Sequence, residues 1–324
     1  MTNRVAVLLP VYNEVETVTA AVESILAQEE CEDFDLVLSD HQSTDGTLAI
    51  LREYRETYKG RHTIKLGHCP REVNEDSVRG VHQHLNWLMK QCDNEFFIMS
   101  TGDDIEYPLR VGTTMQYYES QGKPGFISSN QDIKKNDGTI SQRTVSMGVF
   151  RKIPIEDFAN FDGSGAWING STAWSRALWD RFGPLPSHYA NDIVMPFWAA
   201  LAEDLGGFHI GKPLRLFHMT GDQTGLGARY MVSKDAPTQL QLMELMAYER
   251  YAIGRYFRKM LESELDSYTV WLSYMDQESA KRRKGRLEYV HRRLTQDLLR
   301  SADNWVHARE GMITKGIAPI HYPN

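Results

Sequence analysis

Short apolar runs alternate with stripes of apolar residues at helical spacing along the first 130 residues of the chain. The run Val5–Leu9 is continuously apolar, which is typical of a strand buried on both faces. A helical stripe follows from Val18 to Leu26. Strands that alternate with helices predict βαβ units and a parallel sheet. Further strands are predicted at Leu36–Leu38, Ile64–Leu66 and Phe96–Met99.

Each predicted strand ends in polar residues, except the weak one at 64–66. The first is followed by Pro10–Glu14, the second by Ser39–Gly46 and the fourth by Ser100–Asp104. Right-handed crossovers bring the carboxyl ends of parallel strands to one edge, where open α/β sheets bind ligands. Three polar strand ends at one edge therefore predict a ligand site.

Composition sets limits on the class of protein. The 324 residues are 41% hydrophobic and 24% charged, as in ordinary globular chains, and the net charge of -7 argues against a nucleic-acid binder that works by bulk charge. The three cysteines form no CxxC pair, so neither a zinc site nor a disulfide framework is predicted. The longest apolar stretches, such as Ile193–Leu201, are too short to span a membrane. We expect a cytoplasmic location.

Adjacent carboxylates at the end of the fourth strand are the most informative feature. Asp103 and Asp104 repel each other and are costly to desolvate at the end of a buried strand, and a divalent cation relieves that cost. Alternatively, the pair caps the helix that begins near Tyr107. Asp45 is expected to cap a helix that opens at Gly46–Thr47, whereas Asp40 lies where a strand delivers its side chain to the edge and can accept hydrogen bonds from a ribose or a base.

These segments, in their order and spacing, resemble the family 2 glycosyltransferases of the GT-A fold. The resemblance lies in Val7–Glu14, Ser39–Thr47 and Thr101–Asp104, and continues with Asn191–Phe197, which is similar to the family's acidic acceptor-site motif, and with the strand Lys212–His218. It extends over about residues 3–228, which is 226 of the 324 residues. It implies an α/β domain over 1–228 with a mostly parallel central sheet, followed by a C-terminal helical region over 229–324.

The resemblance also implies a function. It predicts a metal-dependent, inverting transfer of a sugar from a nucleoside diphosphate sugar, a UDP-sugar first among them, to a hydroxyl of a saccharide or lipid-linked saccharide, as in polysaccharide biosynthesis. The cofactor would be Mn²⁺ or Mg²⁺, which offsets charge on the leaving diphosphate. The roles carried over are donor binding by Pro10, Tyr12, Glu14, Asp40 and Asp103, metal binding by Asp104 and by His218, general-base catalysis by Asp192, and acceptor contacts by Trp167 and Asn191.

Two departures from the family pattern leave alternatives open. The family often has a second Asp where this chain has His41, so uridine, thymidine and guanosine all remain as bases for the donor. Members also often end the later strand with Arg-x-His, whereas here His218 either takes the place of the Arg or binds the metal from a shifted position. Trp167 either stacks on a sugar or packs in the core.

Three other classes of function can be compared with the residues present. A nucleotidyltransferase usually has a Gly-rich basic loop after its first strand, but the loop here is Val11–Glu14, which is acidic and lacks Gly. A non-catalytic nucleotide-sugar-binding protein would be favoured if Asp104 or Asp192 were missing, and both are present. The missing glycine fingerprint excludes a nicotinamide oxidoreductase.

The last hundred residues have a helical pattern with an apolar stripe that needs a partner. That partner is expected to be the first domain's surface near the acceptor side or the same region of a second subunit, which would give a homo-oligomer. The basic run Lys281–Arg286 is either a solvated helix face or a contact with anionic lipid head groups at the inner face of the membrane. The stripe consists of Leu240, Met243, Ala247, Tyr251 and Gly254.

Overall fold

The computed structural model describes residues 3–70, 77–135, 137–143, 150–159, 171–186, 191–218 and 236–317. Two compact units make up the chain, each assembled from two segments. The first consists of Met1–Ile153 and Ala166–Gly221, and the second of Pro154–Gly165 and Asp222–Asn324. The predicted domain boundary after residue 228 lies outside the described residues.

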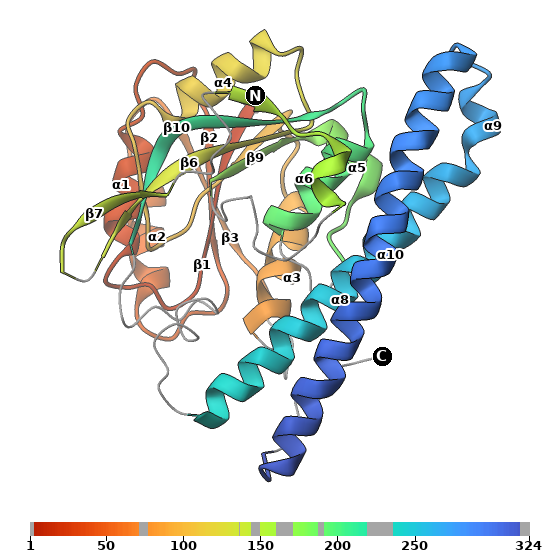
Figure 1. The fold of residues 1–324 in the computed structure, drawn as a ribbon. Coiled ribbons are helices and arrows are strands. Elements are labelled where there is room, and N and C mark those ends of the chain that lie inside the picture. The colour runs from red at the N-terminus through yellow and green to blue at the C-terminus, as the bar shows by residue number, and fades with distance from the viewer. Residues whose placement is uncertain are drawn as a thin grey trace. The chain divides into compact units, whose positions relative to one another are not determined.

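The first unit is built on a mixed sheet whose strand order is β3-β2-β1-β4-β9-β6-β10-β5, with β7 beside β6 and β8 beside β10 (Figure 1). The four predicted strands are confirmed and lie parallel to one another. β9 runs antiparallel between β4 and β6. The strands are β1 (Val5–Val11), β2 (Asp35–Asp40), β3 (Thr63–His68), β4 (Phe96–Met99), β5 (Ile105–Glu106), β6 (Phe126–Lys134), β7 (Ile140–Arg143), β8 (Phe150–Lys152), β9 (Thr172–Ser175) and β10 (Gly207–His218).

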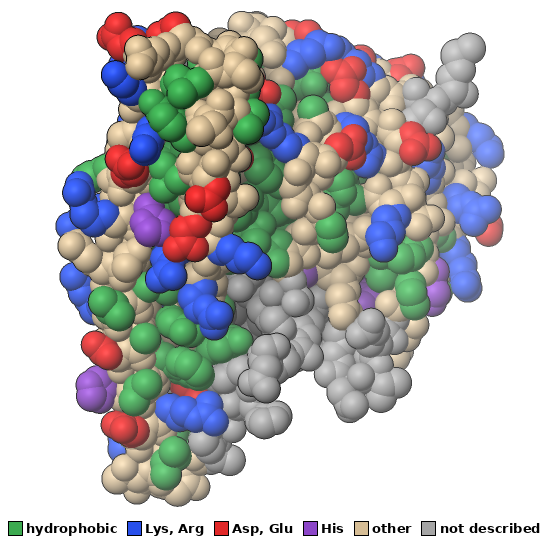
Figure 2. Space-filling view, turned by 90° about the vertical axis from the view of Figure 1, so that its right-hand side faces the viewer, with side chains coloured by type: hydrophobic (Ala, Val, Ile, Leu, Met, Phe, Trp, Pro, Cys, Tyr) green, Lys and Arg blue, Asp and Glu red, His purple; other side chains and the backbone are tan. Residues whose placement is uncertain are grey.

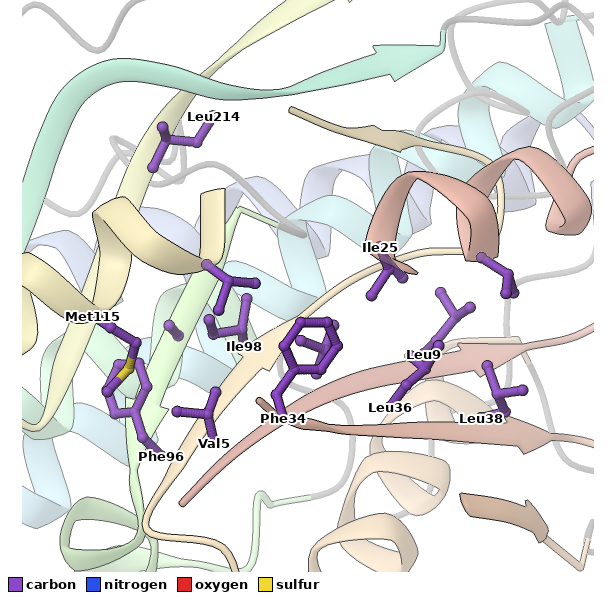
Figure 3. Packing of buried hydrophobic residues seen from close by; sticks show 14 of the residues in the cluster. Val5, Leu9, Ile25, Phe34, Leu36, Leu38, Phe96, Ile98, Met115 and Leu214 are labelled. Atoms are coloured by element: carbon purple, nitrogen blue, oxygen red, sulfur yellow. The ribbon is translucent and has the colours of Figure 1, made fainter. Parts of the chain in front are cut away.

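Helices of the first unit cover both faces of this sheet. Val5, Val7 and Leu9 of β1 pack in one buried cluster with side chains of α1, α2 and α4 (Figure 3). On the opposite face, Ser39 of β2 hydrogen-bonds His84 of α3 at 2.7 Å. The helices are α1 (Val18–Leu26), α2 (Thr47–Thr57), α3 (Ser77–Lys90), α4 (Arg110–Ser120), α5 (Arg176–Phe182) and α6 (Asn191–Leu201).

The register of the parallel strands places their polar ends side by side. Val11 of β1 pairs with Asp40 of β2, and Asp40 pairs with His68 of β3. Leu214 of β10 belongs to the same buried cluster as β1, so β10 is fixed to the core one residue before Arg215 (Figure 3). The sheet thus anchors both halves of the predicted ligand edge.

The second unit is a long antiparallel helical hairpin, α8 (Ala236–Asp266) and α10 (Gln277–Thr314), joined through α9 (Tyr268–Trp271) and accompanied by the short η1 (Ile155–Phe158). A side chain at Gly254 of α8 would lie 3.1 Å from Leu298 of α10, so this glycine lets the helices approach closely. Tyr251 stacks on Trp305 with 5.7 Å between ring centroids. For these two members of the predicted stripe, the partner is therefore α10 of the same unit, which the sequence analysis did not name.

The basic run at 281–286 is largely paired within its own unit. Arg283 is buried, with an ion pair to Glu264 at 2.9 Å and its guanidinium 4.5 Å from the Trp271 ring centroid. Three further pairs are Arg282–Glu278 at 3.6 Å, Lys284–Glu288 at 3.7 Å and Arg286–Glu156 at 3.7 Å. Basic and acidic side chains are correspondingly interspersed on the face drawn in Figure 2. None of the helices in the described residues is long and apolar enough to cross a membrane.

Candidate active site

The loops after β1 and β2 are tied together at the ligand edge. The backbone N–H of Asn13 donates to the Ser43 hydroxyl at 3.0 Å, and the Asn13 side chain accepts from the N–H of Thr44 at 2.8 Å. Asp45 accepts from the N–H of Thr47, in the first turn of α2, at 3.0 Å and from the N–H of Val15 at 3.1 Å. Asp45 therefore bonds the first residue of α2 and fixes the neighbouring loop, but the prediction that it caps the helix is wrong, because the N-cap is Gly46.

Asp40 is a fully buried carboxylate at the end of β2. Its two oxygens accept from the N–H of Ser43 at 3.3 and 3.2 Å, and Oδ2 lies 3.2 Å from Nδ1 of His68, whose side chain is about half exposed. These long contacts leave acceptor capacity on the carboxylate, because an ionised carboxylate offers about four acceptor positions. Asp40 therefore keeps acceptor positions for a further hydrogen bond, although a ligand reaches them only if the residues that cover the carboxylate move.

Aromatic rings lie next to Asp40. The ring of Tyr12 meets that of His41 edge-on at 6.2 Å between centroids, and His41 lies 4.8 Å from His84. Burial, and secondarily the charge of His41, lowers the pKa of His84 to about 3, so that ring is neutral. Pro10, the remaining predicted donor contact on β1, pairs with Ser39 in the register.

Glu14 lies between the first and fourth strand ends. Its Oε2 is buried and has no hydrogen-bond partner among the described residues. Burial, together with the charges of Asp103 and Asp45, raises its pKa well above the usual range. A Cβ atom at Gly102 would collide with this carboxylate and would lie 2.8 Å from Cγ1 of Val11. Glycine at 102 therefore gives Glu14 its place beside the turn.

The two carboxylates of the turn have different surroundings. Asp103 is half-buried, whereas the Asp104 side chain is 1% exposed. Asp104 Oδ2 forms an ion pair with Nη2 of Arg215 and accepts from the Thr101 hydroxyl, while Oδ1 accepts from the backbone N–H of His218 at 2.9 Å. The prediction that Asp104 binds the metal stays a prediction, and it requires the ion pair with Arg215 to open.

The helix-capping alternative for the acidic pair is not what the structure shows. α4 begins at Arg110, its N-cap is Leu109, and neither position receives a side-chain cap. The turn instead bonds to β10, more than a hundred residues further along the chain. Asp104 thus has a structural partner in β10, and a role of Asp103 in ligand binding stays a prediction.

His218, at the end of β10, is held against the acidic turn through its backbone. Its side chain is half-buried, and burial and Lys134 lower the pKa of its ring while Asp103 opposes them. The ring is thus biased towards the neutral form that binds metals. Within the described part of the chain, no three His, Cys, Asp or Glu side chains gather into a group that could hold a metal ion by themselves.

The side chains predicted to act on the acceptor are not among those that the structure describes. Asn191 and Asp192 form the start of α6, as their sequence context suggests, but their side chains fall outside the described set. Trp167 lies outside the described residues altogether. The base, acceptor and stacking roles of these three residues stay predictions.

Arg215 is the residue of this site that sequence reasoning missed. It lies in an apolar strand between Leu214 and Leu216, and its side chain is 1% exposed. Burial lowers its pKa to about 10, while the charge of Asp103 opposes that shift. A charged residue inside an apolar strand needs a buried partner, so its position was a signal that an acidic residue lay nearby.

Comparisons with known proteins identify the family. The model of the family described as Glycosyl transferase family 2 matches residues 6–175, which is 170 of the 324 residues. EpsE of Bacillus subtilis (strain 168), itself named a glycosyltransferase only provisionally, is 29% identical over 116 residues; that match spans 36% of this chain and 38% of the length of EpsE. The chain belongs to glycosyl transferase family 2.

Solved structures show the same fold at low sequence identity. S. aureus TarS 1-349 in complex with UDP-GlcNAc has a TM-score of 0.53 at 15% identity, covering 98% of this chain and 92% of that one. The mannosyltransferase PcManGT from Pyrobaculum calidifontis, in complex with GDP-Man and Mn²⁺, has a TM-score of 0.51 at 15% identity, covering 91% and 87%. The predicted GT-A fold with a C-terminal helical region is confirmed.

Proposed function

We propose that the protein transfers a sugar, with inversion, from a nucleoside diphosphate sugar to a hydroxyl of a saccharide or lipid-linked saccharide, with the aid of a divalent cation. The observation that carries the proposal is that carboxylates follow β2 and β4, on either side of β1, at one edge of the sheet, where each can have a separate task. Asp40 is buried with spare acceptor capacity, and Asp103 is half-buried, one residue before Asp104, which is ion-paired with Arg215 of β10. One suits a nucleoside and the other a metal–diphosphate group.

Donor recognition begins at Asp40. A buried carboxylate can accept from the N3–H of uracil or from ribose hydroxyls, and the neighbouring Tyr12 ring offers a stacking surface. A UDP-sugar is our first choice of donor, supported by the UDP-GlcNAc bound to TarS; GDP-mannose, bound to PcManGT, is the alternative. Pro10 and Glu14 would complete the donor contacts.

The residues present fit a divalent cation. Asp103 is a half-buried carboxylate, Glu14 Oε2 is a buried oxygen without a partner among the described residues, and His218 is biased towards its neutral form. Mg²⁺ and Mn²⁺ commonly bind one or two carboxylates and take further oxygens from substrate phosphates. We propose Asp103 as the first protein ligand, with His218 as a second candidate and Asp104 available once its ion pair opens. When bound, the cation offsets charge on the leaving diphosphate.

Transfer itself would depend on the acceptor side. A carboxylate that takes the proton of the attacking hydroxyl, on the face opposite the leaving group, gives inversion. We assign this role to Asp192, at the start of α6, with Asn191 and Trp167 as acceptor contacts. The support for Asn191 and Asp192 is the resemblance of Asn191–Phe197 to the family's acidic acceptor-site motif, which lies beyond the residues that the family model matches.

Location and assembly are also proposals. We propose that the protein works in the cytoplasm, at the inner face of the membrane if its acceptor is lipid-linked, and that it binds no nucleic acid. Exposed apolar side chains on α10 support a homo-oligomer formed through the C-terminal helices. They recur at every seventh residue, as in a helix-to-helix contact, and are Leu299, Val306 and Ile313.

A panel of nucleotide sugars tests the donor assignment. Thermal unfolding would be followed with each of UDP-GlcNAc, UDP-glucose, GDP-mannose and dTDP-glucose, with Mn²⁺ and with a chelator. A donor at about 100 times its dissociation constant should stabilise the fold by roughly 2.7 kcal/mol. Stabilisation by one base series that needs Mn²⁺ supports the proposal, whereas no stabilisation by any member of the panel would refute it.

A further inference from the structure

Arg215 presents an arrangement that the fold alone does not require. Its side chain is buried in β10, and among the described residues only Nη2 has hydrogen-bond partners: Asp104 and, at 3.4 Å, the Thr101 hydroxyl. Nε and Nη1 are buried with no hydrogen-bond partner among the described residues. A buried ion pair is often no more stabilising than apolar residues of the same size, and unmet donors add to its cost. A buried arginine with two unpartnered donor atoms among the described residues, beside the acidic turn, suggests a role in the site.

The contacts of Arg215 determine what the acidic turn presents to a ligand. All the hydrogen bonds of Asp104 point towards Arg215, Thr101 and the N–H of His218, and its carboxylate is buried. Asp103, one residue earlier, remains half-buried. The ion pair thus turns one carboxylate of the pair inwards, neutralises it, and fixes the end of β10 against the turn.

We propose that Arg215 is a positioning residue that limits the Asp103–Asp104 turn to one free carboxylate and holds His218 beside it. The inference rests on the proposed function, because it concerns how that site balances a cation against a diphosphate. Two free carboxylates beside Glu14 would attract a bare cation more strongly but would repel the nucleotide. With Asp104 paired to Arg215, the single free carboxylate still attracts the cation. The diphosphate then meets less repulsion, so the cation and the diphosphate can bind together.

The decisive variant is Arg215→Met, which keeps much of the volume and removes the charge. Mn²⁺ would be titrated into nucleotide-free protein and followed by electron paramagnetic resonance, and UDP would be titrated calorimetrically with Mn²⁺ present. In R215M we expect Mn²⁺ alone to bind about 3–10-fold more tightly and UDP about tenfold more weakly, because a freed charge acts with opposite sign on the two ligands. Arg215→Lys should stay near the wild type in both titrations.

Two further variants separate positioning from a purely structural role. The double variant D104N/R215M removes both charges, so its affinity for Mn²⁺ alone should return to the wild-type level. Arg110→Met is the matched control, since Arg110 is another buried arginine, ion-paired with Glu106 and 3% exposed. R110M should lower the melting temperature without changing the affinity for Mn²⁺.

Folded R215M that binds Mn²⁺ and UDP as the wild type does would overturn the proposal. Should R215M not fold, Asp104→Asn decides with the opposite sign: the freed charge of Arg215 should weaken the binding of Mn²⁺ alone and strengthen the binding of UDP measured with a chelator present. Folded D104N that binds UDP no more tightly than the wild type does would refute the proposal. A wild-type protein that binds neither Mn²⁺ nor any nucleoside diphosphate would instead refute the proposed function itself.

Discussion

Glu14→Gln should make the protein more stable at neutral and alkaline pH. The glutamine keeps the shape of the side chain but cannot ionise. In the folded protein, burial and the charges of Asp103 and Asp45 raise the pKa of Glu14 well above that of the unfolded chain. Between those two pKa values the unfolded state is ionised and the folded state holds the proton, so the wild type loses stability as pH rises.

The change in the free energy of unfolding is set by a single proton, which the folded wild type keeps on Glu14 and the unfolded chain loses. The stability advantage of E14Q should be small below about pH 4.5, should grow by up to about 1.4 kcal/mol per pH unit above it, and should level off above the folded pKa. The buried Oε2 without a partner among the described residues is the reason to expect most of the full slope.

Urea unfolding of both proteins at pH 5, 6, 7 and 8, with a chelator present, measures the difference directly. Glu16→Gln is the control, because Glu16 is an exposed neighbour in the same loop, and its curve should run parallel to that of the wild type. An advantage of E14Q that does not change with pH, or one that shrinks as pH rises, would show that Glu14 is not held in the protonated form.

Three other predictions concern the acceptor, the turn and the surface. Asp192→Asn should bind donor normally and lose transfer by roughly 10²–10⁴-fold, and transfer within a few-fold of the wild type would assign the proton to another group. Gly102→Ala should displace the Glu14 carboxylate, lower stability by about 1–3 kcal/mol and weaken donor binding, as measured by urea unfolding and calorimetry; unchanged donor affinity would contradict it. Neutralising Lys281, Arg282 and Arg286 should abolish flotation with anionic vesicles if the run contacts lipid; flotation that persists would place the membrane contact elsewhere.

Local sequence patterns predicted those parts of the fold that depend on neighbours along the chain. β1, β2 and β4 are buried on both faces, so their continuous apolar runs could be recognised in the sequence. The parallel topology then predicted that their polar ends lie at the same edge of the sheet. β3 is an edge strand with exposed ends, and its signal was correspondingly weak. The family resemblance supplied the roles of the residues, which composition and spacing could not.

Long-range pairings could not be predicted in the same way. β9 is inserted antiparallel between β4 and β6, and the pairing of β10 with β6 shifts register at Ile210–Pro213 and again at Pro213–Leu216. These irregularities decide which side chains of β10 reach the turn. The Arg215–Asp104 pair joins residues 111 positions apart, and no periodicity in the sequence encodes such a contact.

We propose that Asp103 and a divalent cation together hold a nucleoside diphosphate at this sheet edge. This arrangement can be tested by calorimetric titration of UDP into wild-type protein and into Asp103→Asn, each with Mn²⁺ and with a chelator. We predict Mn²⁺-dependent binding by the wild type and a loss of at least about tenfold in D103N, with no further weakening of D103N when Mn²⁺ is removed. Equal, Mn²⁺-dependent binding of UDP by both proteins would show that Asp103 does not hold the cation.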